Sequence, residues 1–142
     1  MYNVRMLFAV TAMSLITGCA SGLNSYQKAE LDHYEAKGLV IEEKSPGAGA
    51  ALGLLPGGGS FYGRSYGIGV VNLLFWPVSI LWDPVSGYDA ATAINYHATK
   101  VHVDDLKSKA MDDLDTQLAG GEIDLTQYTL KKRKVDDKYK YN

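Results

Sequence analysis

The only cysteine of the chain, Cys19, stands where a thiol can be lipidated. It follows Leu-Ile-Thr-Gly, so two small residues, Thr17 and Gly18, come directly before it. A peptide that enters the narrow site of a signal peptidase needs small residues at these positions. The thiol can carry a diacylglycerol group as a thioether. These residue types and their spacing predict cleavage between Gly18 and Cys19 and a lipid on Cys19.

The residues before Cys19 have the pattern of an export signal. Arg5 is the only charge, and the 11 residues from Met6 to Ile16 form an apolar run. The spacing resembles the lipobox of bacterial lipoproteins, in which the residue matching Cys19 becomes the acylated first residue. The resemblance implies a signal peptide over 1–18 and a membrane anchor of acyl chains such as palmitate. The alternatives are an ordinary secretory signal peptide and a buried helix that ends in Gly-Cys.

The lipid and the residues after it also predict a location. Three acyl chains, at about 0.8 kcal/mol per buried methylene, make release from a membrane negligible. In Gram-negative lipoproteins an Asp directly after the lipidated Cys commonly marks retention in the inner membrane, whereas this chain has Ala20 and Ser21. By that resemblance we expect the cell envelope, at the periplasmic leaflet of the outer membrane rather than the inner membrane.

The composition from Cys19 onward limits the partners, the size and the stabilisation of the protein. The 124 residues carry 13 basic and 16 acidic side chains, a net charge of −3, and this balance does not favour a nucleic-acid partner. They suffice for one small domain. With Cys19 lipidated, no disulfide can form in an oxidising periplasm, so packing or the membrane must supply the stability.

Residues 19–45 predict a short helix and a connector. Residues 24–37 are polar and helix-prone, Asn24 or Ser25 can cap their start, and Gly38 stands where a C-cap glycine would. Residues 39–45 show no regular alternation of apolar and polar side chains, and they lead to Pro46. This pattern favours an extended connector.

Residues 46–88 are apolar and rich in glycine. No Asp, Glu or Lys occurs over 46–82, where Arg64 is the single charge. A helix over 67–82 would rise roughly 24 Å, against a hydrocarbon core of about 30 Å. A repeat of four residues would place three glycines on one helical face, where a second helix can approach closely: Gly49, Gly53 and Gly57. The pattern predicts a membrane-associated helical hairpin that spans, re-enters or lies on the bilayer.

Aromatic residues stand at both ends of this hairpin, as interfacial aromatics do in membrane proteins. Those near the expected turn are Phe61, Tyr62 and Tyr66, and those at the exit are Trp82 and Tyr88. The alternative is a glycine-rich loop followed by one buried helix of a soluble domain, which Asn72 and Pro77 favour.

The same stretch resembles the two-transmembrane-helix domain family, which has a small-residue apolar helix, a Gly-Phe-Tyr-like turn and a second helix ending in Trp and Asp. The resemblance covers about 43 residues and implies no common catalytic activity. The matching residues are Ala50, Leu52, Gly53, Leu54, Leu55, Phe61, Tyr62, Gly63, Gly67, Gly69, Leu73, Leu74, Ile80, Trp82 and Asp83.

Residues 89–142 return to a charged helical pattern. Five apolar residues, at steps of three and four, predict an amphipathic helix that ends at Gly120-Gly121: Val103, Leu106, Ala110, Leu114 and Leu118. The alternation over 101–103 can interrupt it, with Asp104 as a new N-cap. A last helix is predicted after Asp124, with Leu125, Tyr128 and Val135 on its inner side.

The carboxyl-terminal segment carries two further signals. Leu118, Gly121, Ile123 and Tyr128 resemble the short helical-hairpin domain called SHOCT, which implies self-association or partner binding. The basic run, Lys131, Lys132, Arg133 and Lys134, gives the last 12 residues a net charge of +4. It is either a solvated helix face or a contact for anionic lipid or peptidoglycan.

No group of residues points to an enzyme. His33, His97 and His102 lack metal-ligand spacing, and we expect no cofactor, metal or catalytic residue. The sequence predicts a mainly α lipoprotein: a glycine-rich membrane-associated hairpin followed by amphipathic periplasmic helices. Its expected role is structural or in protein interaction, with a homo-oligomer or an envelope protein as partner. The alternative is a membrane-perturbing or pore-forming protein, because glycine-zipper hairpins can oligomerise in lipid.

Overall fold

The structure is a computed structural model that describes residues 22–141. These residues form helices and no strand, which confirms the mainly α fold class. The signal peptide and Cys19 lie outside the described residues. The elements are α2 (Ser25–Ala36), α3 (Pro46–Leu52), α4 (Gly58–Tyr62), α5 (Tyr66–Leu74), the 3₁₀ helix η1 (Val78–Leu81), α6 (Asp83–Ala119) and α7 (Leu125–Tyr139).

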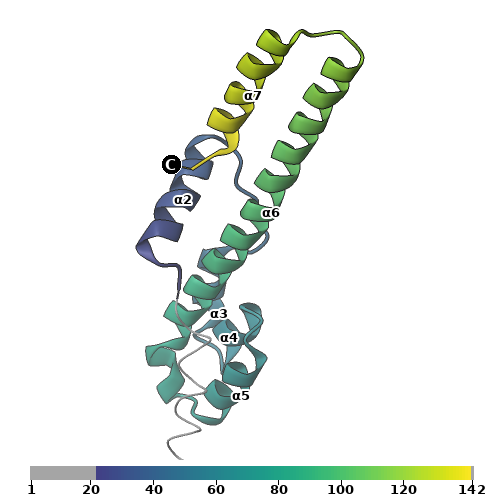
Figure 1. Ribbon diagram of the computed structural model, residues 1–142. Helices are drawn as coiled ribbons and strands as arrows, with labels where there is room; N and C mark the ends of the chain where they lie inside the picture. Colours follow the sequence, from purple (N-terminus) through teal and green to yellow (C-terminus); the bar gives the residue numbers. More distant parts are fainter. Residues whose placement is uncertain (1–21, 142) are drawn as a thin grey trace, which may run out of the picture.

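Helix α6 is the axis of an elongated molecule (Figure 1). Its 37 residues rise about 55 Å at 1.5 Å per residue. The short helices α3, α4 and α5 gather around its beginning, α7 runs antiparallel along its far half, and α2 lies beside its middle. We call residues 46–88 the head and residues 89–139 the stalk.

Helix α2 confirms the prediction for residues 24–37. The side chain of Asn24 accepts the N–H of Gln27, and the Gln27 side chain accepts the N–H of Asn24, so the two form a capping box. Gly38, at φ +67°, follows the last turn.

The connector over 39–45 runs along α6 through hydrogen bonds to two buried side chains. The Thr99 hydroxyl accepts the N–H of Ile41 at 3.0 Å. The Asn95 amide accepts the N–H of Lys44 at 2.8 Å and donates to the Lys44 carbonyl at 2.7 Å. These contacts satisfy the backbone of an extended segment and place α3 at the beginning of α6.

The head is built from short elements instead of two hairpin helices. The prediction of one helix over 67–82 is wrong, because α5 ends at Leu74 and η1 begins only at Val78. Pro77, which has no N–H to donate, lies in the turn between them. No helix within residues 22–141 is both long and apolar enough to span a bilayer.

The stalk is one uninterrupted helix paired with α7. The predicted break over 101–103 is wrong, since α6 continues through Asp104. Val103 and Leu114 are buried as predicted, and Asp124 caps α7. Leu125 was predicted to face inward but is exposed, because it lies in the first turn of α7, on its outer side. A core of Tyr34, Val103 and Tyr139 joins α2, α6 and α7.

Candidate functional site

A fully buried carboxylate organises the head. Asp83 accepts the backbone N–H groups of Gly59 and Ser60 at 3.0 and 3.1 Å, and the Ser60 hydroxyl at 2.5 Å. It also accepts the side-chain amide of Asn72 at 2.7 Å, and the Asn72 oxygen accepts the indole N–H of Trp82 at 2.9 Å. This network could not be predicted from the sequence, where its only signal is three polar residues in an apolar stretch: Ser60, Asn72 and Asp83.

The three glycines expected on one helical face do not share a helix. Gly53 is the C-cap of α3, and Gly57, at φ +68°, precedes α4, because the chain turns between them. Two of the three nevertheless contact α6. A Cβ on Gly49 would lie 2.4 Å from the carbonyl oxygen of Gly87, and a Cβ on Gly53 would lie 2.3 Å from the nitrogen of Pro84. Their close approach is thus to a helix of the same chain.

The head leaves 14 large apolar side chains exposed. Leu74 and Leu81 retain 76% and 80% of their accessible surface. A patch of this kind marks an interaction site in a folded protein. Its members, which we call the apolar surface, are Leu54, Leu55, Tyr66, Val70, Val71, Leu73, Leu74, Phe75, Trp76, Val78, Leu81, Trp82, Val85 and Tyr88.

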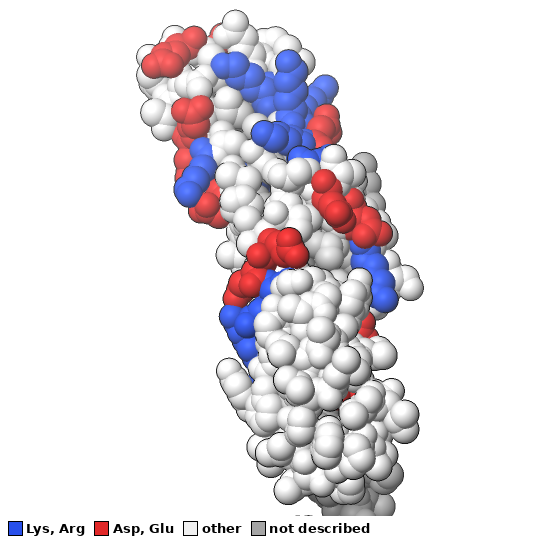
Figure 2. Space-filling model, turned by 180° about the vertical axis from the view of Figure 1, so that it is seen from behind, with Lys and Arg blue, Asp and Glu red and all other residues white. Residues whose placement is uncertain are grey.

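Charge is nearly absent from the same end of the molecule. Figure 2 shows the head as an almost uncharged body, and the charged side chains spread over the rest of the molecule. Within 46–83 the two charges are Asp83, which is buried, and Arg64, which pairs with Glu43 of the connector. The apolar surface therefore carries no ionic group that must be desolvated when it is covered.

The predicted interfacial aromatics divide into two groups. Phe61 lies over α5, and the hydroxyl of Tyr62 accepts the N–H of Ser45 at 3.0 Å, so both serve internal packing. The other three stay exposed and belong to the apolar surface: Tyr66, Trp82 and Tyr88.

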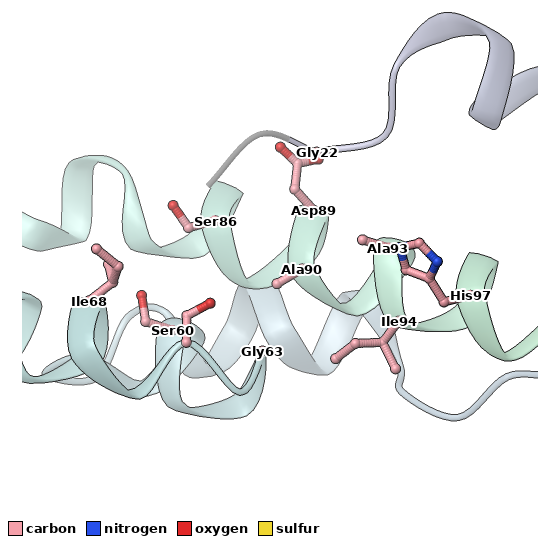
Figure 3. A pocket seen from close by; sticks show the side chains of 11 residues that line it. Gly22, Ser60, Gly63, Ile68, Ser86, Asp89, Ala90, Ala93, Ile94 and His97 are labelled. Carbon is pink, nitrogen blue, oxygen red and sulfur yellow. The ribbon is translucent and has the colours of Figure 1, made fainter. Parts of the chain in front are cut away.

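A groove opens between α4, α5 and the beginning of α6 (Figure 3). Its volume is about 180 Å³. Gly22, next to Asp89, lies at one side, and Gly63 and Ile94 lie across from it. Most of the lining is apolar or small, and the remaining wall residues are Ser60, Ser65, Ile68, Ser86, Ala90, Ala93 and His97.

A second buried carboxylate, Glu30, joins α2 to α6 and was also missed. It accepts the hydroxyls of Tyr34 at 3.1 Å and Tyr96 at 2.7 Å, and the ammonium of Lys100 at 2.8 Å. Burial alone would raise the pKa of Glu30, but the hydrogen bonds from Lys100 and Tyr96 outweigh it and lower the pKa. Burial and the nearby carboxylate raise the pKa of Tyr34 and of Tyr96 to about 12. These groups hydrogen-bond to one another, which suits a structural role.

The basic run lies on α7, away from the head. Lys131 donates to the Gln117 side chain of α6 at 2.8 Å, and all four side chains of the run are exposed. In Figure 2 basic side chains gather on the stalk, toward the end opposite to the head. The structure therefore separates the basic run from the apolar surface.

The sequence resemblances stay predictions. The lipobox lies outside residues 22–141, and the residues that resemble the two-transmembrane-helix family lie in the head. The SHOCT-like residues lie at the turn between α6 and α7. No family model, curated protein or solved structure matches the chain.

Proposed function

We propose that the protein is a non-enzymatic envelope lipoprotein, held in the membrane by acylated Cys19 and by its head. The observation that carries this proposal is the uncharged head with its apolar surface. Each apolar side chain of this size that becomes fully buried contributes about 1.5–3 kcal/mol. If several such side chains enter the boundary between the headgroups and the acyl chains of the membrane, they form a second anchor in addition to the lipid on Cys19.

The start of the described chain supports a position of the lipid near the head. Gly22 lies beside Asp89, where the head meets the stalk. Cys19 is three residues earlier and so within about 10 Å of Gly22. The lipid and the apolar surface would therefore meet the membrane at the same end of the molecule.

The stalk is then the part that is free to act. It would project into the periplasm and offer α6 and α7 to a second copy or to an envelope protein. The glycines of the head already pack against α6 of their own chain, which supports this structural role over a pore built from glycine contacts between chains.

Mass spectrometry and fractionation test the proposal. The native protein should begin at Cys19, carry diacylglycerol and acyl groups, and sediment with the outer membrane in a density gradient. A Cys19→Ser variant should lose the lipid and most of the outer-membrane fraction. A chain that still begins at Met1 with a free thiol would overturn the proposal.

A further inference from the structure

We infer that the groove between α5 and α6 holds part of one acyl chain carried by Cys19. The inference rests on the proposed lipidation and assigns a place to one of the chains that it supplies. The remaining chains would enter the bilayer beside the head.

The position of Gly22 brings the lipid to the groove. Gly22 lines the groove, and a Cβ there would lie 2.7 Å from the Asp89 carboxyl carbon, so the chain passes tightly at this point. The three residues back to Cys19 reach at most about 10 Å when extended. The thioether can therefore stand at the mouth of the groove.

The lining fits a hydrocarbon chain. Small residues, Ala90, Ala93 and Gly63, leave the space open, and Ile68 and Ile94 give it apolar walls. The carboxylate of Asp89 stands beside Gly22, where the polar glyceryl and ester groups would remain (Figure 3). The volume of about 180 Å³ is enough for a part of one chain.

Intramolecular photo-crosslinking tests the assignment on the full chain. Cells that produce the protein are fed a fatty acid bearing a diazirine, the membranes are irradiated, and the purified protein is digested and sequenced by mass spectrometry. We expect a link between the acyl chain on Cys19 and residues of the groove, foremost Ile68 or Ile94.

Two substitutions on α6 provide the comparison. Ala93→Phe fills the groove and should abolish the link while the lipid on Cys19 stays. Val101→Phe, at an exposed position on the same helix, should retain the link. Circular dichroism checks that both variants are folded.

The outcomes separate the two proposals. A labelled Cys19 whose links fall only on phospholipid or on exposed residues such as Leu74 overturns the groove assignment and leaves the lipoprotein proposal standing. An unlabelled Cys19 overturns both.

Discussion

Asp83 caps the beginning of helix α4 from a distant position in the sequence, whereas most helices are capped by the residue that precedes them. Helix α4 begins after Gly57, which has no side chain to cap the free N–H groups. The carboxylate of Asp83, the first residue of α6, accepts the N–H groups of Gly59 and Ser60 instead. A negative group at a helix N-terminus is favourable, and here it also ties α4 to α6. One residue thus couples α4 to α6, the helix that continues into the stalk.

Replacement of Asp83 should unfold the head and spare the stalk. Asp83→Ala leaves several buried donors without an acceptor, at about 1–3 kcal/mol each, so we expect a loss above about 3 kcal/mol. The only two tryptophans, Trp76 and Trp82, lie in the head, so their fluorescence reports its unfolding, while far-ultraviolet circular dichroism follows the stalk.

The matched control for Asp83 is Asp105→Ala on the same helix. Asp105 is exposed and pairs only with Lys109, so its loss should cost under about 1 kcal/mol. Equal effects of the two substitutions on tryptophan fluorescence would show that the buried network does not hold the head.

The stability of the protein should depend on pH through Glu30 and its three partners, Tyr34, Tyr96 and Lys100, which we call the Glu30 cluster. The pKa values of Tyr34 and Tyr96 are raised to about 12 from 10.0, so their contribution is complete below pH 10 and is lost as the pH rises toward 12. The pKa of Glu30 is lowered from 4.5, so its contribution is present above pH 4.5 and is lost as the pH falls further. We expect α2 to detach from α6 at both extremes.

Tyrosine absorbance during an alkaline titration measures the first of these effects. Tyr96→Phe should remove one late-titrating hydroxyl and lower the stability by about 1–2 kcal/mol at neutral pH. Tyr66→Phe, at an exposed position of the head, is the control and should cost no stability. A Tyr96→Phe variant with as many late-titrating hydroxyls as the unaltered protein would contradict the assignment.

At the scale of elements, close contact between helices holds the head together. Gly53→Ala would bring a Cβ within 2.3 Å of the backbone of Pro84, which cannot move aside as a flexible side chain can. We expect a loss of about 1–3 kcal/mol, measured by denaturant unfolding with tryptophan fluorescence. Gly47→Ala is the control, because its Cβ would meet only the Ser45 hydroxyl at 3.9 Å and a helical alanine stabilises by about 0.5–1 kcal/mol. Similar losses of stability in both variants would refute the close contact of Gly53 with Pro84 as the cause.

Sequence signals predicted the elements whose determinants are local. The capping box at Asn24 and the cap at Asp124 lie within three residues of their partners, and the glycines after α2 and α6 end those helices. The head depends instead on pairs distant in sequence, such as Asp83 with Gly59. Its apolar residues fit a continuous membrane helix as well as the broken α5 and η1, so composition alone could not separate the two. The Glu30 cluster was missed for the same reason, since Lys100 lies 70 residues away.

At the scale of the molecule, the apolar surface predicts membrane binding without the lipid. A chain that begins at residue 19 and carries Cys19→Ser should bind neutral phosphatidylcholine vesicles through the head. Leu74→Glu and Leu81→Glu should abolish this binding in a flotation assay, because a charge would have to enter the acyl boundary. Val101→Glu, which changes an exposed apolar residue of the stalk, should not. Vesicle binding that survives both changes in the head would rule out insertion of the apolar surface.

The length of α6 decides which anionic partner the basic run can reach. Lys131 contacts Gln117, which follows Tyr88, the last residue of the head, by 29 residues, so the run begins about 44 Å along α6 from the head. That distance is several times the screening length of about 8 Å in physiological salt, so anionic lipid under the head cannot attract it. If the run has a partner, the geometry favours peptidoglycan over the anchoring membrane.

Charge reversal at Lys132, Arg133 and Lys134 should therefore lower cosedimentation with isolated peptidoglycan and leave binding of the lipidated protein to anionic vesicles unchanged. Lys109→Glu, an exposed change elsewhere on the stalk, is the control. A weaker binding of the triple variant to anionic vesicles, at about 1 kcal/mol per basic residue, would mean that the stalk lies along the bilayer instead of standing away from it.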